Sequence, residues 1–279
     1  MVVRQPKRDS PLDVRTLGEA DFDAAALAVR MLGTDRDLRP FYRAVKAIPW
    51  LDAIATRMRG IKPPRYPTLW EAFVNAVMFQ QVSIHAASAI LRRVVETLSK
   101  PLEYQGRKIY PFFEPADFLR TRSAELRKAG VSESKELTLN AVADALTSGM
   151  LAESDLEAMS TNDALARLMM LRGIGPWTAA VICLRGLGRL DVFPLEDSGV
   201  ARSLADLSGE ANASVAQILD VLGEQRGMLY YHLLLGRLES QGHLETSHAV
   251  VPRPFRPQSA PPPRNRPPGR GPKRRGRKR

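Results

Sequence analysis

From Leu171 to Ala179 the sequence reads Leu-Arg-Gly-Ile-Gly-Pro-Trp-Thr-Ala, which is the most informative segment of the chain. Gly173 and Gly175 lie between an apolar helix and a second helix, a pattern that predicts a tight hairpin. A helix that begins at Pro176 offers unpaired amides and the positive end of its dipole, which together can hold a phosphate oxygen. Proline suits this first turn because it has no amide to lose. An ordinary helix–turn–helix corner with glycine at the bend is the alternative.

A carboxylate follows the second helix. Asp197 stands in Phe-Pro-Leu-Glu-Asp-Ser-Gly, about twenty residues beyond the hairpin, so the chain can deliver it beside whatever the hairpin holds. Its alternative role is the N-cap of a helix that begins at Ser198. Glu196 is a rival carboxylate whose register fits the pattern less well. Hairpin and carboxylate together favour an enzyme that acts on DNA.

The cysteine and histidine content limits the chemistry of the chain. Cys183 is the single cysteine, which excludes a disulfide framework and any four-thiolate metal or iron–sulfur site. The four histidines are not at metal-ligand spacing from one another. The amino terminus lacks an apolar run before a cleavage site, and no stretch reaches membrane-spanning length. We therefore expect a soluble, cytoplasmic protein of bacterial type without a metal.

The formal net charge of +11 resides in the carboxyl-terminal tail. Of the 41 Lys and Arg residues, 11 lie in residues 251–279, which contain no Asp or Glu. The rest of the chain has 30 basic and 30 acidic residues, so a nucleic-acid face there must come from local arrangement. The Pro/Arg-rich composition of the tail predicts disorder. The tail is either a solvated linker or, as we favour, a polybasic tether for DNA.

Apolar spacing predicts an all-α chain with almost no strand. Thr68 and Glu71 stand in capping-box register at the start of a helix over 69–98, which we expect to break near Val82 and Ser83. A proline-containing loop is expected over 101–115. Further helices are expected at about 132–147, 160–171, 176–187, 198–207, 214–222 and 226–238.

Three parts follow from these patterns. Residues 1–20 form an irregular amino-terminal segment, and residues 21–250 form a helical domain that contains the hairpin 171–179. We expect residues 251–279 to form a disordered basic tail.

Several motifs together resemble a known family. The segment Trp70–Ser83 ends in Gln-Gln-Val-Ser, and Leu126–Lys135 reads Leu-Arg-Lys-Ala-Gly-Val-Ser-Glu-Ser-Lys. With the hairpin and Asp197, in this order and with similar gaps, they are similar to the helix-hairpin-helix base-excision DNA glycosylases. Within that family the chain most resembles bacterial 3-methyladenine DNA glycosylase II. The resemblance covers roughly residues 22–242.

The resemblance implies a fold and a reaction. The fold is all-α, with two packed helical subdomains and a cleft between them. The reaction is hydrolysis of the N-glycosidic bond of alkylated purines, 3-methyladenine in type, after the base leaves the duplex. Asp197 matches the catalytic aspartate, a fixed anion that stabilises the positive charge of a sugar losing its base. Trp177 stands where lyase members carry a lysine, so the resemblance implies a monofunctional enzyme without a Schiff base.

The resemblance also implies contact residues. Trp177 would stack on the flipped base, and Tyr230 and Tyr231 would line its pocket, although one helix cannot aim both inward and packing is equally expected. Gln81 would fill the gap left by the base, or it is an exposed polar residue at a helix end. The remaining implied DNA contacts are Gly173, Gly175, Thr178, Ser83 and Arg202.

The implied partner is duplex DNA that contains damaged bases. We expect a nucleoid-associated monomer that binds no membrane and no cofactor. A monovalent cation bound to the hairpin carbonyls is left as an open alternative. Two alternatives remain. One is a non-catalytic helix-hairpin-helix DNA-binding protein, which has no need of a carboxylate close to an anionic duplex. The other is a glycosylase for another purine lesion.

Overall fold

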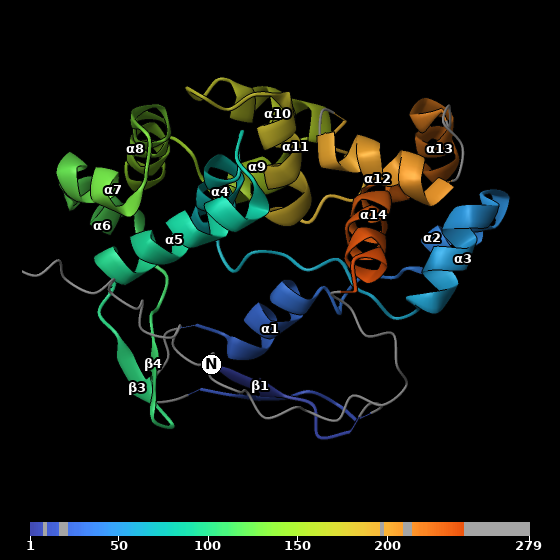
Figure 1. Ribbon diagram of the computed structural model, residues 1–279, viewed down its shortest axis with the longest axis horizontal. Helices are drawn as coiled ribbons and strands as arrows, with labels where there is room; N and C mark the ends of the chain where they lie inside the picture. The colour runs from blue at the N-terminus through green and yellow to red at the C-terminus, as the bar shows by residue number, and fades with distance from the viewer. Residues whose placement is uncertain (8–9, 17–21, 196–197, 209–213, 243–279) are drawn as a thin grey trace, which may run out of the picture. The chain divides into compact units, whose positions relative to one another are not determined.

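The structure, a computed structural model, describes residues 1–7, 10–16, 22–195, 198–208 and 214–242. Helices make up most of these residues (Figure 1). The first half contains β1 (Val2–Arg4), β2 (Asp13–Arg15), α1 (Ala24–Leu32), α2 (Arg39–Ala44), the 3-10 helix η1 (Val45–Ala47), α3 (Pro49–Arg57), α4 (Leu69–Met78), α5 (Ile84–Leu98), β3 (Leu102–Tyr104) and β4 (Arg107–Ile109). The second half contains α6 (Pro115–Arg120), α7 (Ser123–Ala129), α8 (Glu133–Thr147), α9 (Glu153–Ala158), α10 (Thr161–Met169), α11 (Pro176–Arg185), α12 (Ser198–Ser208), α13 (Val215–Leu222), the 3-10 helix η2 (Gly223–Gln225) and α14 (Gly227–Ser240).

The predicted break in the first long helix is confirmed. Helix α4 ends at Met78 and α5 begins at Ile84. Ser83 is the N-cap of α5, because its Oγ accepts a hydrogen bond from the amide of Ala86 at 3.2 Å. The residues between the two helices therefore form a separate turn, 79–83.

The few strands among the described residues form two small antiparallel sheets, which agrees with the expectation of an all-α chain with almost no strand. Within the segment expected to be irregular, β1 pairs with β2. Within the expected proline-containing loop, β3 pairs with β4 through Gln105 and Gly106, whose φ angles of 50° and 71° suit a two-residue hairpin turn. Each strand has only three residues and β3–β4 is largely exposed, so no alternation of apolar and polar residues marks these strands in the sequence.

The helices pack in two groups (Figure 1). In the first group, α4 contacts α5, α8 and α11, and α8 also contacts α6 and α7. In the second, α14 contacts α3 and α12, and α13 contacts α2. The amide of Gly227 donates to Leu190 O at 2.7 Å, and the Tyr231 hydroxyl donates to Pro64 O at 3.2 Å, which joins the groups. The two groups agree with the two helical subdomains that the family resemblance implies.

Helix α4 is the most enclosed helix of the first group. Its apolar residues lie on every side and eight of them are buried, which is typical of a helix inside a core. The Trp70 indole Nε1 donates to Phe113 O at 2.9 Å, and its ring contacts Phe113 and Phe118 edge to face. Because α4 is held on all sides, the turn at its carboxyl end is anchored to the core.

Candidate nucleic-acid interface and active site

The two hairpin glycines differ in their backbone conformation and in what surrounds them. Gly173 has a φ of 76°, and a Cβ built there would overlap the Thr138 side chain of α8. Gly175 is the N-cap of α11 with an ordinary φ of −91°, and nothing lies within 4 Å of the position that its Cβ would take. Packing therefore requires glycine at 173, whereas glycine at 175 leaves open space before the first turn of α11. That space is where a phosphate would approach the amides of a helix N-terminus.

Gln80 connects the turn 79–83 to the hairpin. Its side-chain Nε2 donates to Gly173 O at 3.1 Å and to Thr178 Oγ1 at 2.8 Å. The structure therefore corrects the role predicted for Thr178: this side chain is 2% exposed and faces Gln80, so it supports the hairpin instead of meeting a phosphate. The residues concerned are 93 and 98 positions apart in sequence, and helix patterns alone do not reveal such a contact.

Lys135 supports the same turn from α8. Its Nζ donates to Met78 O at 2.7 Å and to Gln80 O at 3.0 Å. Both acceptors lie at the carboxyl end of α4, where carbonyls lack intrahelical partners and the helix dipole is negative. Burial lowers the pKa of Lys135. In the sequence, this lysine stands out only as the last residue of the motif Leu126–Lys135.

The turn 79–83 presents an exposed surface. Gln81 is exposed and has a φ of 55°, one of two positive φ angles among the described non-glycine residues. Val82 is 38% exposed and Ile84 is 55% exposed. Gln81 therefore lies on a turn that its neighbour Gln80 joins to the hairpin at Gly173 and Thr178.

The predicted base-pocket aromatics occupy different environments. Trp177 is half-buried and packs against the core, and Tyr230 is half-buried as well. Tyr231 is 4% exposed with its hydroxyl bonded to Pro64 O, so its ring packs in the core. Burial raises the pKa of Tyr231 well above its usual range. Of the two tyrosines, Tyr230 is therefore the better candidate for a pocket wall.

The predicted carboxylates, Asp197 and Glu196, lie outside the described residues. The chain that leads to them is described as far as Leu195, which is 64% exposed after the buried Val192 and Phe193. Helix α12 starts at Ser198, immediately after Asp197 in sequence. Arg202, the predicted DNA contact on α12, is exposed.

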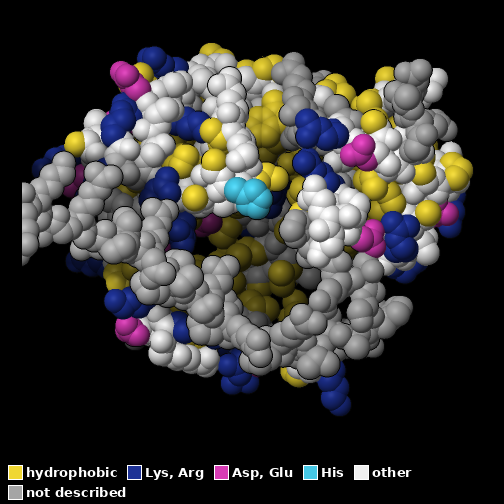
Figure 2. Space-filling view, in the orientation of Figure 1, with side chains coloured by type: hydrophobic (Ala, Val, Ile, Leu, Met, Phe, Trp, Pro, Cys, Tyr) yellow, Lys and Arg dark blue, Asp and Glu magenta, His cyan; other side chains and the backbone are white. Residues whose placement is uncertain are grey.

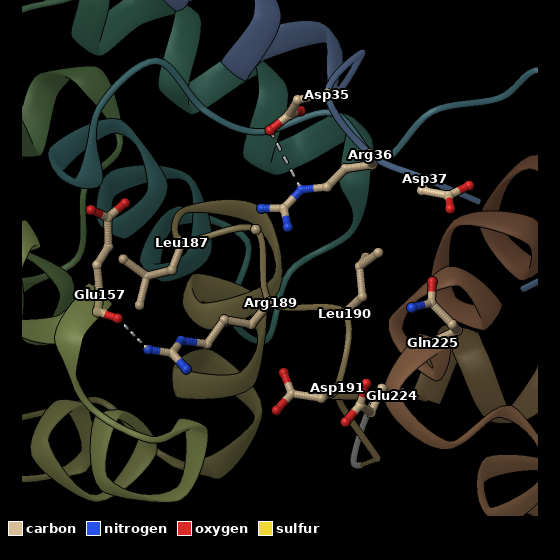
Figure 3. Close-up of a pocket in the computed structure, with 11 residues that line it drawn as sticks. Asp35, Arg36, Asp37, Glu157, Leu187, Arg189, Leu190, Asp191, Glu224 and Gln225 are labelled. Atoms are coloured by element: carbon tan, nitrogen blue, oxygen red, sulfur yellow. Dashed lines mark hydrogen bonds and ion pairs between the residues drawn. The ribbon is translucent and has the colours of Figure 1, made fainter. Parts of the chain in front are cut away.

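A cavity of about 550 Å³ lies at the other end of α11 (Figure 3). Its lining includes the acidic residues Asp35, Asp37, Glu157, Asp191 and Glu224, but only two arginines. One of these, Arg189, is already bonded to the carbonyls of Leu156 and Met159 at 2.7 Å and 2.6 Å. An acidic lining repels a DNA backbone, so this cavity is not the nucleic-acid interface.

Two further features concern the described ranges: possible metal-binding groups and the length of the apolar helices. There, no three His, Cys, Asp or Glu residues are grouped so that they could hold a metal ion. Burial raises the pKa of the Cys183 thiol to about 12, so it stays protonated. No helix in the same ranges is long and apolar enough to cross a bilayer.

Lys and Arg side chains are spread over the face drawn in Figure 2 and do not form one dense patch. The exposed Arg172 lies within the hairpin itself. Because residues 1–250 carry as many acidic as basic side chains, any nucleic-acid contact of this part would rely on the backbone of the hairpin and on a few placed side chains.

The fold and the hairpin place this chain in a defined class. Residues 74–222 match the family described as HhH-GPD superfamily base excision DNA repair protein, and the chain belongs to this family. Within it, the chain resembles 3-methyladenine DNA glycosylase II.

Relatives and solved structures agree with this assignment. The chain is 31% identical over 170 residues to a DNA-3-methyladenine glycosylase of Bacillus subtilis. The match covers 61% of this chain and 56% of that protein. It matches the crystal structure of a DNA-3-methyladenine glycosidase from Bacillus halodurans with a TM-score of 0.56 and 26% identity, over 74% of this chain and 92% of that one. It also shares the fold of the Schizosaccharomyces pombe 3-methyladenine DNA glycosylase Mag1, solved with abasic DNA, at a TM-score of 0.55 and 22% identity, over 76% and 97% of the two chains. The chain thus spans little more than half of the curated relative.

Proposed function

We propose that this protein is a monofunctional DNA glycosylase that hydrolyses the N-glycosidic bond of alkylated purines, 3-methyladenine in type, in duplex DNA. The observation that carries the proposal is the link between two surfaces: the open N-terminus of α11 at Gly175 and the exposed Gln81 turn, joined by Gln80. The names of the relatives support an alkylated base as the target.

In this proposal each contact residue has its own role. The first-turn amides of α11 hold a backbone phosphate next to the damaged nucleotide. Gln81 enters the space that the flipped base leaves, and Trp177 with Tyr230 stacks on the base outside the duplex. The same turn sets the register of the lesion over the hairpin.

Asp197 supplies the chemistry. Departure of the base leaves positive charge on the deoxyribose, and a carboxylate fixed beside the sugar stabilises that charge and orients the attacking water. An alkylated purine is already cationic and leaves readily, so no separate acid is required. With tryptophan at position 177 no amine is available there for a Schiff base, and the product is an abasic site in an intact strand.

The surroundings of the reaction belong to the same proposal. The protein acts as a monomer on damaged duplex DNA, without a cofactor, in the cytoplasm at the nucleoid. The basic tail, residues 251–279, tethers it to DNA by neutralising phosphates.

Chromatography of the bases freed from methylated duplex DNA tests the activity. We expect release of 3-methyladenine and related alkylated purines, abasic sites in unbroken strands, and no covalent complex after borohydride treatment. A borohydride-trapped complex would show lyase chemistry, and release of an oxidised or deaminated purine alone would assign another lesion. Binding without any release would support the non-catalytic alternative.

A further inference from the structure

We propose that Lys135 is a positioning residue that locks the turn 79–83 onto the hairpin, so that the two DNA-contacting segments are set in register before DNA arrives. The inference rests on the proposed function. It assigns a task to a residue that lies beneath the interface and that none of the predicted contacts includes.

The first step is the position of the Lys135 ammonium group. Its two described hydrogen bonds go to the carbonyls of Met78 and Gln80, one on each side of the end of α4. A half-buried ammonium is costly unless its donors are used, and two carbonyls at the negative end of a helix dipole satisfy it without a carboxylate. Lys135 therefore holds the backbone on both sides of Phe79.

The second step is the side chain that this backbone carries. With its own carbonyl bound to Lys135, Gln80 directs its amide to Gly173 O and Thr178 Oγ1. The carbonyl and the side chain of one residue are thus bound to opposite neighbours. If the backbone bond were lost, the amide of Gln80 would lose its aim as well.

The third step is a shared support. Thr138 lies one helical turn after Lys135, on the same face of α8, and packs directly under Gly173. One face of α8 therefore carries the turn through Lys135 and the hairpin through Thr138. The two loops are placed relative to each other by a single rigid element.

The fourth step concerns Gln81. Its φ of 55° is a left-handed conformation that non-glycine residues rarely adopt and that persists only where the surroundings impose it. Gln81 itself is exposed, so the constraint must come from its neighbours. Gln80, bound at both its carbonyl and its amide, is the neighbour that supplies it.

The test uses the full-length protein with Lys135→Met, which keeps the length of the side chain and removes its donors. Lys128→Met is the matched control, because it removes the same charge from an exposed position on α7. Three measurements are made: single-turnover base release from methylated duplex at saturating enzyme, the salt dependence of duplex binding, and fluorescence of 2-aminopurine placed opposite a tetrahydrofuran abasic analogue.

We expect Lys135→Met to lower the single-turnover rate at least tenfold and to lose most of the 2-aminopurine signal. The slope of log binding constant against log salt should stay equal to that of Lys128→Met, because Lys135 contacts no phosphate. Lys135→Arg, which keeps donors for both carbonyls, should recover the rate to within about threefold of wild type.

Several results would overturn the inference. A salt slope flattened by about one would make Lys135 a phosphate contact instead. A rate and a fluorescence signal equal to those of Lys128→Met would remove any positioning role. If Lys135→Met fails to fold, Gln80→Leu in an otherwise intact protein must show the same loss of rate and signal, and a normal rate in that variant also refutes the inference.

Failure of the proposed function is separable. If wild type releases no base but displaces 2-aminopurine, the glycosylase proposal fails and the fluorescence arm alone decides the role of Lys135. If wild type does neither, both proposals fall together.

Discussion

Gly173 of the hairpin packs directly against Thr138 of α8, with no room for a methyl group between them. Two residues away, Gly175 faces open space. The hairpin therefore contains one glycine that the fold needs and one that the fold does not need, which gives a direct way to separate folding from binding.

Gly173→Ala should lower the free energy of unfolding by about 2–4 kcal/mol, because a left-handed alanine and an overlap with Thr138 both oppose it. Urea unfolding followed by circular dichroism measures this loss. Gly175→Ala is the matched control, with a change within about 1 kcal/mol. Gly175→Ala should instead weaken duplex binding, because the new methyl group fills the space through which the phosphate approaches. Equal stability of the two variants would contradict this assignment.

His232 should make the protein less stable in mild acid. The ring is fully buried, its Nδ1 lies 2.8 Å from Met228 O, and it packs against Phe41 at 4.7 Å between centroids. Burial lowers its pKa, so the folded state keeps the ring neutral. The unfolded chain takes up a proton near its ordinary value of about 6.5. The contribution of the neutral His232 ring to the free energy of unfolding is therefore fully present above that pH. It is lost as the pH falls from there toward the folded pKa.

Urea titrations from pH 8 to pH 5 measure this dependence. In His232→Leu the acid-side decline should be shallower than in wild type. Parallel curves for the two proteins would show that the decline comes from other groups.

Glu71 should make the protein less stable as the pH rises, which is the opposite of the effect of His232. Burial, and then the neighbouring charge of Glu114, raises its pKa to about 7 from an ordinary value of 4.5. The folded state binds this proton more tightly than the unfolded chain, so stability falls as the pH rises from 4.5 to about 7. Glu71→Gln should remove that penalty and stabilise the protein at pH 8 by about 1–2 kcal/mol, after discounting for partial exposure to solvent. Thermal unfolding at pH 5 and pH 8 provides the comparison; an equal gain at both values would rule out titration as the cause.

Removal of residues 251–279 should weaken duplex binding and flatten its salt dependence. The deletion takes away 11 positive charges and leaves a formally neutral chain. Each phosphate that the protein no longer neutralises should flatten the slope of log binding constant against log salt by about 0.9. Fluorescence anisotropy between 50 and 200 mM salt (roughly the range over which such slopes are measured) tests it. An unchanged slope would identify the tail as a linker only.

Local signals in the sequence predicted most of the helical framework. Thr68 and Ser83 both cap helices where the sequence indicates a start and a break, because capping depends on residues only three positions apart. The hairpin around Gly173 was predictable because its two glycines and Pro176 also lie within a few residues of one another. Strands β3 and β4 were not, since their three-residue pairing depends on a turn at Gln105 and Gly106 and not on a periodic pattern.

The supports of the candidate site were harder to predict. Lys135 binds Met78 O across 57 residues, and Gln80 binds Thr178 across 98, interactions that only the tertiary packing of α4, α8 and α11 creates. The prediction for Thr178 shows the limit: its position near the start of α11 suggests a phosphate contact, but the helix turns that side chain toward α4. For Tyr231 the sequence left a pocket wall and core packing equally open, and the structure shows core packing, with the hydroxyl bonded to Pro64 O.

The role of Asp197 is tested by comparing Asp197→Asn with wild type on the same methylated duplex. Single-turnover base release should fall about 100-fold or more, because a fixed negative charge is removed without a change of shape. Binding to a tetrahydrofuran abasic duplex should stay within about threefold, since the hairpin and the Gln81 turn are untouched. Release at the wild-type rate would show that this carboxylate does not stabilise the sugar as the base departs.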